Sequence, residues 1–319
     1  MRIAASRPPC RWPQRPSVPS VTCWAGRSAA TDLNFARSLC FGPARHHLFA
    51  TDEEISILSP QPSLFVSHGA PTLMIDPSPA RDFLAGLGAS LEPPKAILVI
   101  SAHFNAPRPT LTAAAQPETI HDFGGFPDEL YRMQYPAPGA PDLAARIALA
   151  LNAAGFDAAT HPARGLDHGA WVPLMLLYPE ADIPVLQLSI SMNQSPQWHY
   201  ELGKALRPLR DEGVLIIGSG GATHNLRAVF SGSYRLDSPP PPWVSDFAGW
   251  LAQHVEAGDH AAILSAVGSA PHGRENHPTM DHILPLFVAL GAGDDGPGQR
   301  LHHSTTYGVL AMDTYAFAA

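Results

Sequence analysis

Ala96-Ile-Leu-Val-Ile-Ser-Ala-His103 carries the clearest signal for the fold of this chain of 319 residues. Five apolar residues run without a break into Ser101 and then His103. Such a run predicts a strand covered on both faces, and ligands of open α/β sheets collect at the carboxyl ends of their strands. The stretch therefore predicts a buried strand that ends in a functional histidine.

Two further segments repeat this arrangement. Ser63-Leu-Phe-Val-Ser-His68 ends in a histidine followed by glycine, and Val214-Leu-Ile-Ile-Gly-Ser219 leads through a glycine-rich turn to His224. Small residues flank all three histidines and leave room for a ligand. Because the carboxyl ends of parallel strands share one edge of a sheet, we expect His68, His103 and His224 to meet there.

Helical and strand patterns alternate along the rest of the chain. Apolar periodicity predicts helices over 141–155, 197–210 and 280–290, the last carrying His282, and a final strand over 308–312 is expected to close the chain. Strands that alternate with helices predict βαβ crossovers. The expected fold is a single-domain α/β protein with a largely parallel central sheet flanked by helices.

The composition is that of a globular protein, and it argues against two kinds of partner. Hydrophobic residues make up 45% of the chain and charged residues 15%. The net charge is −8 and the body has no Lys/Arg clusters, so nucleic acid is not an expected partner. No run of 18 apolar residues occurs, so no membrane is expected either.

Residues 1–60 differ from the rest in composition. Residues 1–50 hold seven arginines against the single acid Asp32, and the segment lacks hydrophobic periodicity. We expect a disordered extension, either a transit peptide or the product of a start codon placed too far upstream, with the folded domain over 61–319. The segment also holds every cysteine of the chain, so the body suits a reducing cytoplasm, the expected location; these residues are Cys10, Cys23 and Cys40.

The histidines that follow the strands have the character of metal ligands. Neutral imidazole is a common ligand for zinc and divalent iron, and a catalytic ion needs protein ligands together with open positions. His282 fits two interpretations equally, a ligand or a helix-start histidine beside the acid Asp281. No serine-hydrolase elbow, phosphate loop or His-Glu-x-x-His helix occurs, so metal chemistry is the favoured interpretation.

Two other histidines suit proton transfer better than metal binding. His168 has Asp167 before it and Gly169 after it, in a segment expected to be a loop. His121 stands beside Asp122 and could serve likewise. Histidine near its ordinary pKa can both accept and donate a proton at neutral pH.

Six short motifs occur in order within roughly residues 62 to 315: Ser67-His-Gly-Ala-Pro71, Ser101-Ala-His-Phe104, Ile120-His-Asp-Phe-Gly-Gly-Phe-Pro127, Asp167-His-Gly-Ala-Trp171, His224-Asn-Leu-Arg227 and Pro278-Thr-Met-Asp-His282. Together they resemble the class III extradiol ring-cleavage dioxygenases, the LigB superfamily, and most closely the 4,5-DOPA extradiol dioxygenase branch. The resemblance implies an α/β fold with one Fe²⁺ or Zn²⁺ ion, and opening of a DOPA-like catechol ring beside its diol.

The resemblance also implies roles for individual residues. His68, His103 and His282 match the ligand histidines, whereas His224 matches a position that is either a fourth ligand or the acid/base. His168 matches a histidine expected to touch the substrate or move protons. An aromatic substrate would further need flat walls, and the candidates to line its site are His121, Phe126 and Trp171.

The implied partners are a small aromatic diol and O₂, and a homodimer is a reasonable assembly. Two rival functions remain open at this level. A zinc hydrolase is one, since three histidines and an open position also make a metal-bound hydroxide. A non-catalytic metal-binding or interaction protein of the same fold is the other. Dependence on O₂ separates a dioxygenase from a hydrolase.

Overall fold

The structure, a computed structural model, describes residues 60–317. The expectations for residues 1–59, the cysteines included, lie outside the described residues. None of the described helices is both long and apolar enough to cross a membrane.

Eight strands form one sheet in the order β4-β3-β5-β2-β6-β1-β10-β7, and β8 and β9 form a separate pair. The bounds of the strands are β1 (Ser63–Ser67), β2 (Ala96–Asn105), β3 (Thr110–Thr112), β4 (Ala159–His161), β5 (Val185–Ile190), β6 (Val214–Gly220), β7 (Gln299–His302), β8 (Thr305–Thr306), β9 (Leu310–Ala311) and β10 (Thr314–Phe317).

The centre of the sheet is parallel and its margins are mixed. Strands β5, β2, β6 and β1 pair in parallel. Beyond them, β3 is antiparallel to β5, and β10 is antiparallel to both β1 and β7. The expectation of an α/β fold with a largely parallel central sheet is confirmed for these four strands, while β4, β7 and β10 were not predicted.

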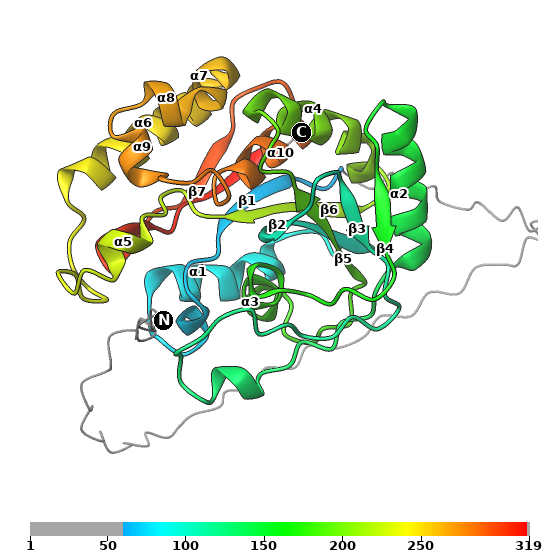
Figure 1. The fold of residues 1–319 in the computed structure, drawn as a ribbon, viewed down its shortest axis with the longest axis horizontal. Helices are drawn as coiled ribbons and strands as arrows, with labels where there is room; N and C mark the ends of the chain where they lie inside the picture. The colour runs from blue at the N-terminus through cyan, green and yellow to red at the C-terminus, as the bar shows by residue number, and fades with distance from the viewer. Residues whose placement is uncertain (1–59, 318–319) are drawn as a thin grey trace, which may run out of the picture. The chain divides into compact units, whose positions relative to one another are not determined.

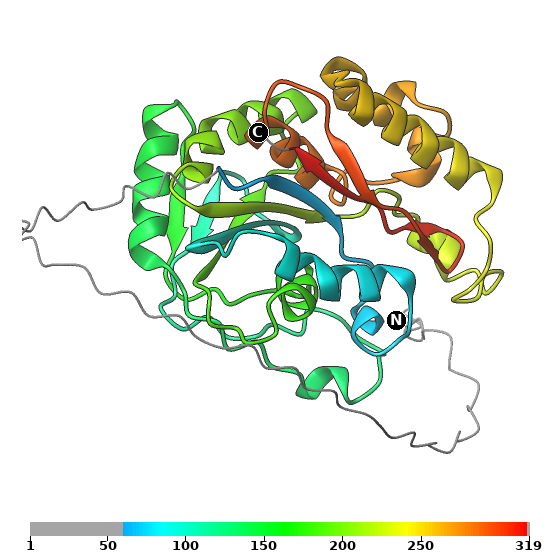
Figure 2. The same ribbon diagram turned by 180° about the vertical axis from the view of Figure 1, so that it is seen from behind.

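Helices cover both faces of the sheet (Figures 1 and 2), and alternate residues of β2 pack against one layer or the other. Leu98 and Ile100 pack in a cluster with residues of α2, α4, α6 and α10, whereas Ile97 and Val99 pack with residues of α1 and α3. The period of two in the strand therefore builds two cores. The helices are α1 (Pro79–Leu87), α2 (Pro141–Ala153), α3 (His168–Leu177), α4 (Pro196–Leu206), α5 (Leu226–Val229), α6 (Pro242–Ala257), α7 (His260–Leu264), α8 (Ala266–Ser269), α9 (Gly273–Asn276) and α10 (Leu284–Ala292).

The strand register brings the predicted histidine positions to one edge. Ser101 of β2 is level with Ser219 of β6, and Ser67 of β1 is level with Gly220. The backbone N–H of His68 then donates to the carbonyl of Gly220 over 3.0 Å. The residues that follow Ser67, Ser101 and Gly220 therefore lie together at the carboxyl edge of the sheet, which is called the rim below.

Two predictions about the last third of the chain are wrong. Residues 280–283 form a turn, because Pro285 occupies the first turn of α10, where its missing N–H costs nothing, and the helix begins only at Leu284. His282 therefore precedes the helix. The final strand is β10, which pairs antiparallel with β1, and residues 310–311 belong to the separate β8–β9 pair.

Candidate metal centre

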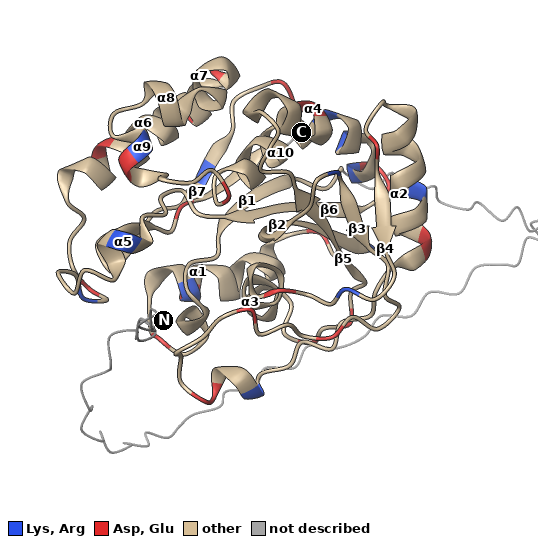
Figure 3. Cartoon of the chain, viewed as in Figure 1, with Lys and Arg blue, Asp and Glu red and all other residues tan. Residues whose placement is uncertain are grey.

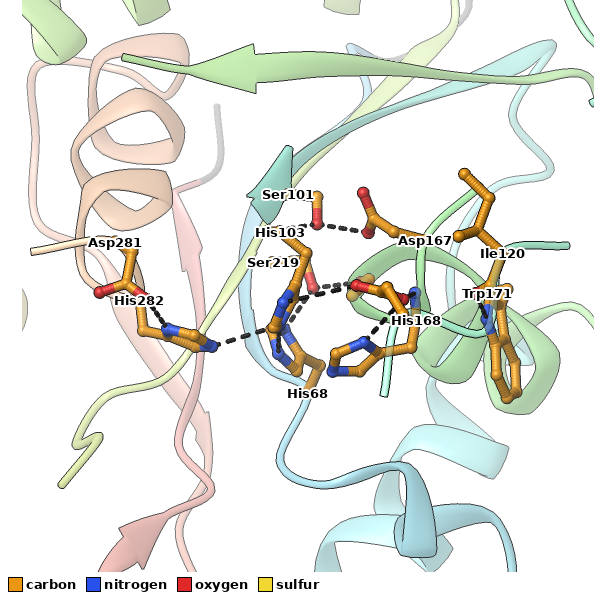
Figure 4. Close-up of polar contacts among 12 residues, drawn as sticks. His68, Ser101, His103, Ile120, Asp167, His168, Trp171, Ser219, Asp281 and His282 are labelled. Atoms are coloured by element: carbon orange, nitrogen blue, oxygen red, sulfur yellow. Dashed lines mark hydrogen bonds and ion pairs between the residues drawn. The ribbon is translucent and has the colours of Figure 1, made fainter. Parts of the chain in front are cut away.

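Three imidazoles from distant parts of the chain converge at the rim (Figure 4). His68 follows β1, His103 lies near the end of β2 and His282 lies in the turn before α10. Their Nε2 atoms are close: His68 to His103 is 3.1 Å and His282 to His103 is 3.3 Å. A metal–nitrogen bond of about 2.0–2.1 Å sets neighbouring ligand nitrogens about 2.9–3.4 Å apart. Both distances lie in this range, and the ligand atoms of all three histidines lie within 4.8 Å of one another, as three ligands on one ion would.

The partners of the other ring nitrogens determine which nitrogens carry lone pairs. The Ser219 hydroxyl donates its single hydrogen to the Gly169 carbonyl, so it accepts one from Nδ1 of His68, 2.9 Å away. Nδ1 of His282 donates to Asp281 over 2.6 Å. Both Nε2 atoms therefore carry lone pairs, and both point at Nε2 of His103. A hydrogen on Nε2 of His103 could satisfy only one of these lone pairs, whereas a cation satisfies both, so the residues fit a divalent metal.

Burial keeps these imidazoles neutral, as metal ligands must be. His68 and His282 are 1% and 4% exposed. Desolvation, followed by the neighbouring imidazoles, holds the pKa of His68 well below its ordinary value. The same causes lower the pKa of His103 to about 2. The pKa of His282 is also lowered by burial, although Asp281 opposes the shift.

Glycines allow the elements that carry the histidines to approach one another. A Cβ on Gly169 would lie 2.5 Å from the Ser101 hydroxyl and 3.0 Å from Cδ2 of His103. A Cβ on Gly220 would run into the carbonyl oxygen of His282. Any side chain at either position would push a histidine-bearing segment away from the rim.

His168 is the first residue of α3 rather than a loop residue, which corrects the expectation. Its backbone N–H and its Nδ1 both lie 2.9 Å from Oδ1 of Asp122. Its ring centroid is 3.9 Å from that of His103 and 5.5 Å from that of His68. Burial acts to raise the pKa of Asp122, but the hydrogen bonds and charge of His168 outweigh it and lower that pKa to about 2. The ring of His168 thus packs against those of His103 and His68, and its Nδ1 is held by the carboxylate of Asp122.

His224 reaches the rim in a different geometry. Its ring stacks on that of His282 with centroids 3.3 Å apart and planes 10° from parallel. Imidazole lone pairs lie in the ring plane, so two nearly parallel planes at this separation cannot both direct a lone pair at one ion. The arrangement favours the acid/base alternative for His224 over the fourth ligand. Burial, then His282, lowers its pKa well below the ordinary value.

The three residues expected to line a substrate site differ in their burial and in their contacts. Trp171 is 0% exposed and its indole N–H donates to the Ile120 carbonyl over 3.0 Å, which favours a packing role. His121 places Nε2 3.0 Å from the Met133 carbonyl, so it holds the loop together. Phe126 is half-buried, and its ring lies 5.2 Å from that of Phe123.

Several residues that support the centre were not assigned from the sequence. Asp122 and Asp281 each adjoin a histidine in sequence, which was the available signal, yet only the fold shows which imidazole each one holds. Behind His103 lies a buried Asp167, which accepts from Ser101 over 2.6 Å and from Gln187 over 2.9 Å. Ser101 and Asp167 lie in two of the motifs, but no pattern linked them to each other or to Gln187, because the three come together only across strands.

The sheet and its rim of three converging imidazoles are those of an α/β protein with residues that could hold one metal ion. The sequence of residues 63–318 matches the protein-family model described as the catalytic LigB subunit of aromatic ring-opening dioxygenase, so the chain belongs to this family.

Similar proteins cover most of the chain. A Beta vulgaris protein named 4,5-DOPA dioxygenase extradiol is 43% identical over 262 residues, which are 81% of this chain and 96% of that protein. A protein of the same name from Escherichia coli (strain K12) is 40% identical over 237 residues, 73% of this chain and 85% of that protein. The crystal structure of an uncharacterized protein from Escherichia coli K12 has a TM-score of 0.68 at 33% identity and covers 81% of this chain and 100% of its own.

Proposed function

We propose that this chain is an extradiol dioxygenase that opens the ring of a DOPA-like catechol with O₂. The convergence of three Nε2 lone pairs from His68, His103 and His282 is the observation that carries the proposal. The relatives named 4,5-DOPA dioxygenase extradiol support the choice of substrate class.

We infer Fe²⁺ as the working metal and Zn²⁺ as the ion that could replace it. An all-imidazole set binds either ion well, so the ligands alone do not discriminate. When bound, Fe²⁺ would supply open positions for the catechol oxygens and O₂ and pass electron density from the ring to oxygen. Zn²⁺ has no such redox chemistry.

Two histidines are placed to move protons. A catechol has two phenolic protons to lose, and ring opening later requires an acid. His168 would act at Nε2, because its Nδ1 is bonded to Asp122. His224, stacked against His282, would act from the other side of the centre.

The aromatic rings of Phe123, Phe126 and Tyr131 would receive the flat substrate. Phe123 lies 5.7 Å from the ring of His168, and the rings of Phe126 and Tyr131 lie 5.2 Å and 5.1 Å from that of Phe123. These half-buried aromatic rings suit a flat substrate beside the imidazoles. Lysines and arginines are distributed over several elements and interspersed with acids (Figure 3), which supports a small-molecule partner rather than a nucleic acid.

Oxygen uptake tests the proposal. The full chain, loaded anaerobically with Fe²⁺, should consume one O₂ per catechol across a panel that includes DOPA and caffeate, with a yellow ring-opened product. The His103→Ala variant should lose this uptake. A chain that hydrolyses a substrate equally well without O₂ would instead be the zinc hydrolase considered above. The homodimer stays a prediction, which analytical ultracentrifugation would test.

A further inference from the structure

One carboxylate contacts two of the imidazoles at the rim. Oδ1 of Asp122 lies 2.9 Å from both the backbone N and Nδ1 of His168. Its Oδ2 lies 3.6 Å from Nδ1 of His103, on the side of that ring away from the converging nitrogens. Asp122 therefore faces a candidate ligand with one oxygen and a candidate acid/base with the other.

The loop that carries Asp122 is held firmly just before this residue. Ile120 donates its backbone N–H to Leu166 over 2.8 Å and accepts the indole N–H of Trp171 over 3.0 Å. Just after Asp122, the chain passes through Gly124 and Gly125, the latter at a φ of 78°. The carboxylate is thus fixed from its N-terminal side, while the segment after it contains two glycines.

The contacts determine the tautomer of His168. A carboxylate is an acceptor only, so Nδ1 of His168 must carry the hydrogen that joins it to Asp122. Nε2 is then left with a lone pair, which is the form able to take a proton from a phenol. Oδ2 of Asp122 lies beside Nδ1 of His103 and therefore favours a hydrogen on that nitrogen, which leaves a lone pair on Nε2 of His103.

We propose that Asp122 is a positioning residue that holds His168 in the Nδ1–H tautomer and orients the ring of His103. One carboxylate thereby fixes both a candidate acid/base and a candidate metal ligand. The inference rests on the proposed function for its catalytic meaning. The tautomer that Asp122 imposes on His168 can be measured without any reaction.

The Asp122→Asn variant is a sharp test because an amide cannot accept on both of its atoms. In one orientation its NH₂ group faces the N–H groups of His168, and in the other it faces Nδ1 of His103. One imidazole must therefore change tautomer or turn away. Asp128→Asn is the matched control, since it removes an exposed acid from the same loop with no effect expected on either histidine.

Imidazole ¹⁵N NMR of the zinc-loaded full chain reads the tautomer directly, with the His168 signals assigned by their loss in His168→Asn. We expect the Nδ1–H form in the parent and in Asp128→Asn, and a shift toward the Nε2–H form of His168 or a changed His103 signal in Asp122→Asn. An Nε2–H form of His168 in the parent, or identical spectra in Asp122→Asn, would overturn the inference. Asp122→Ser provides the same reading if the asparagine variant does not fold.

Two further readouts connect the tautomer to the chemistry. With the metal content unchanged, kcat for catechol cleavage should fall about 10²-fold in Asp122→Asn and stay within about twofold in the control. Anaerobic binding of 4-nitrocatechol, whose visible spectrum shifts as phenolic protons are lost, should give a less ionised probe in Asp122→Asn. If the tautomer changes as expected while the parent cleaves no catechol, the proposed function fails and the positioning role stands.

Discussion

The two ends of strands β2 and β6 carry different chemistry. At their amino ends, Lys95, Arg146 and Glu212 line an open hollow of about 460 Å³, where an exposed ion pair joins Arg146 to Glu212 over 2.9 Å. At their carboxyl ends, buried imidazoles meet with Nε2 atoms 3.1–3.3 Å apart. The exposed pair is screened by water and contributes little, whereas the buried groups are each held by a specific partner. Convergent lone pairs, and not empty volume, therefore mark the metal centre.

Removing a ligand at the carboxyl end should have the largest effect. In His103→Ala we expect loss of bound metal and a fall of catechol cleavage on the order of 10³-fold or more, because two imidazoles alone hold the ion poorly. Metal analysis and oxygen uptake measure the two effects. Arg146→Ala, at the amino end, is the control and should leave both unchanged; a loss there would undo the contrast between the two ends.

Replacing His224 should separate proton transfer from metal binding within the carboxyl end. Because its ring is stacked on His282, we expect His224→Ala to keep one metal per chain while kcat falls on the order of 10²-fold. Titration with Zn²⁺ and steady-state kinetics give the two numbers. Loss of the metal in this variant would make His224 a ligand and would rule out the stacked arrangement in the metal-loaded protein.

Weakening the partner of a ligand should have a smaller effect. Asp281 accepts from Nδ1 of His282 over 2.6 Å and so fixes its tautomer. In Asp281→Asn we expect Zn²⁺ affinity to fall about 10–100-fold with the fold intact. Asp142→Asn, which changes an acid lining the amino-end hollow, should bind Zn²⁺ as the parent does. Equal affinities in the two variants would count against the role of Asp281.

Acid should destabilise the metal-free chain through its buried histidines. Burial lowers the pKa of several of them, so below a pH of about 6.5 the unfolded chain binds protons that the folded chain does not, and the free energy of unfolding falls. The slope approaches about 1.4 kcal/mol per pH unit for each histidine that stays neutral. Urea unfolding at pH 7.5 and 5.5 measures it, and a flat profile would contradict the expectation. The histidines with lowered pKa values include His68, His103, His199, His224 and His277.

The central strands and the convergence of the histidines could be predicted because both depend on local pattern. Unbroken apolar runs specify buried parallel strands, and a residue just past such a strand must lie at the carboxyl edge. The start of α10 was missed by four residues because apolar periodicity runs on through the turn that Pro285 sets. Strands β7 and β10 were missed because their short segments become strands only by pairing with β1 and with each other.

The fold class, the family and the residues that could hold a metal were all predictable from the sequence, since apolar runs, glycines and histidines act through local order along the chain. Three features required the folded structure: which nitrogen of each imidazole faces the centre, the parallel stacking of His224 on His282, and the contacts of Asp122 with both His103 and His168. These features depend on hydrogen-bond partners that are far apart in sequence. Such partners meet only after the two cores have packed, so no pattern along the chain encodes them.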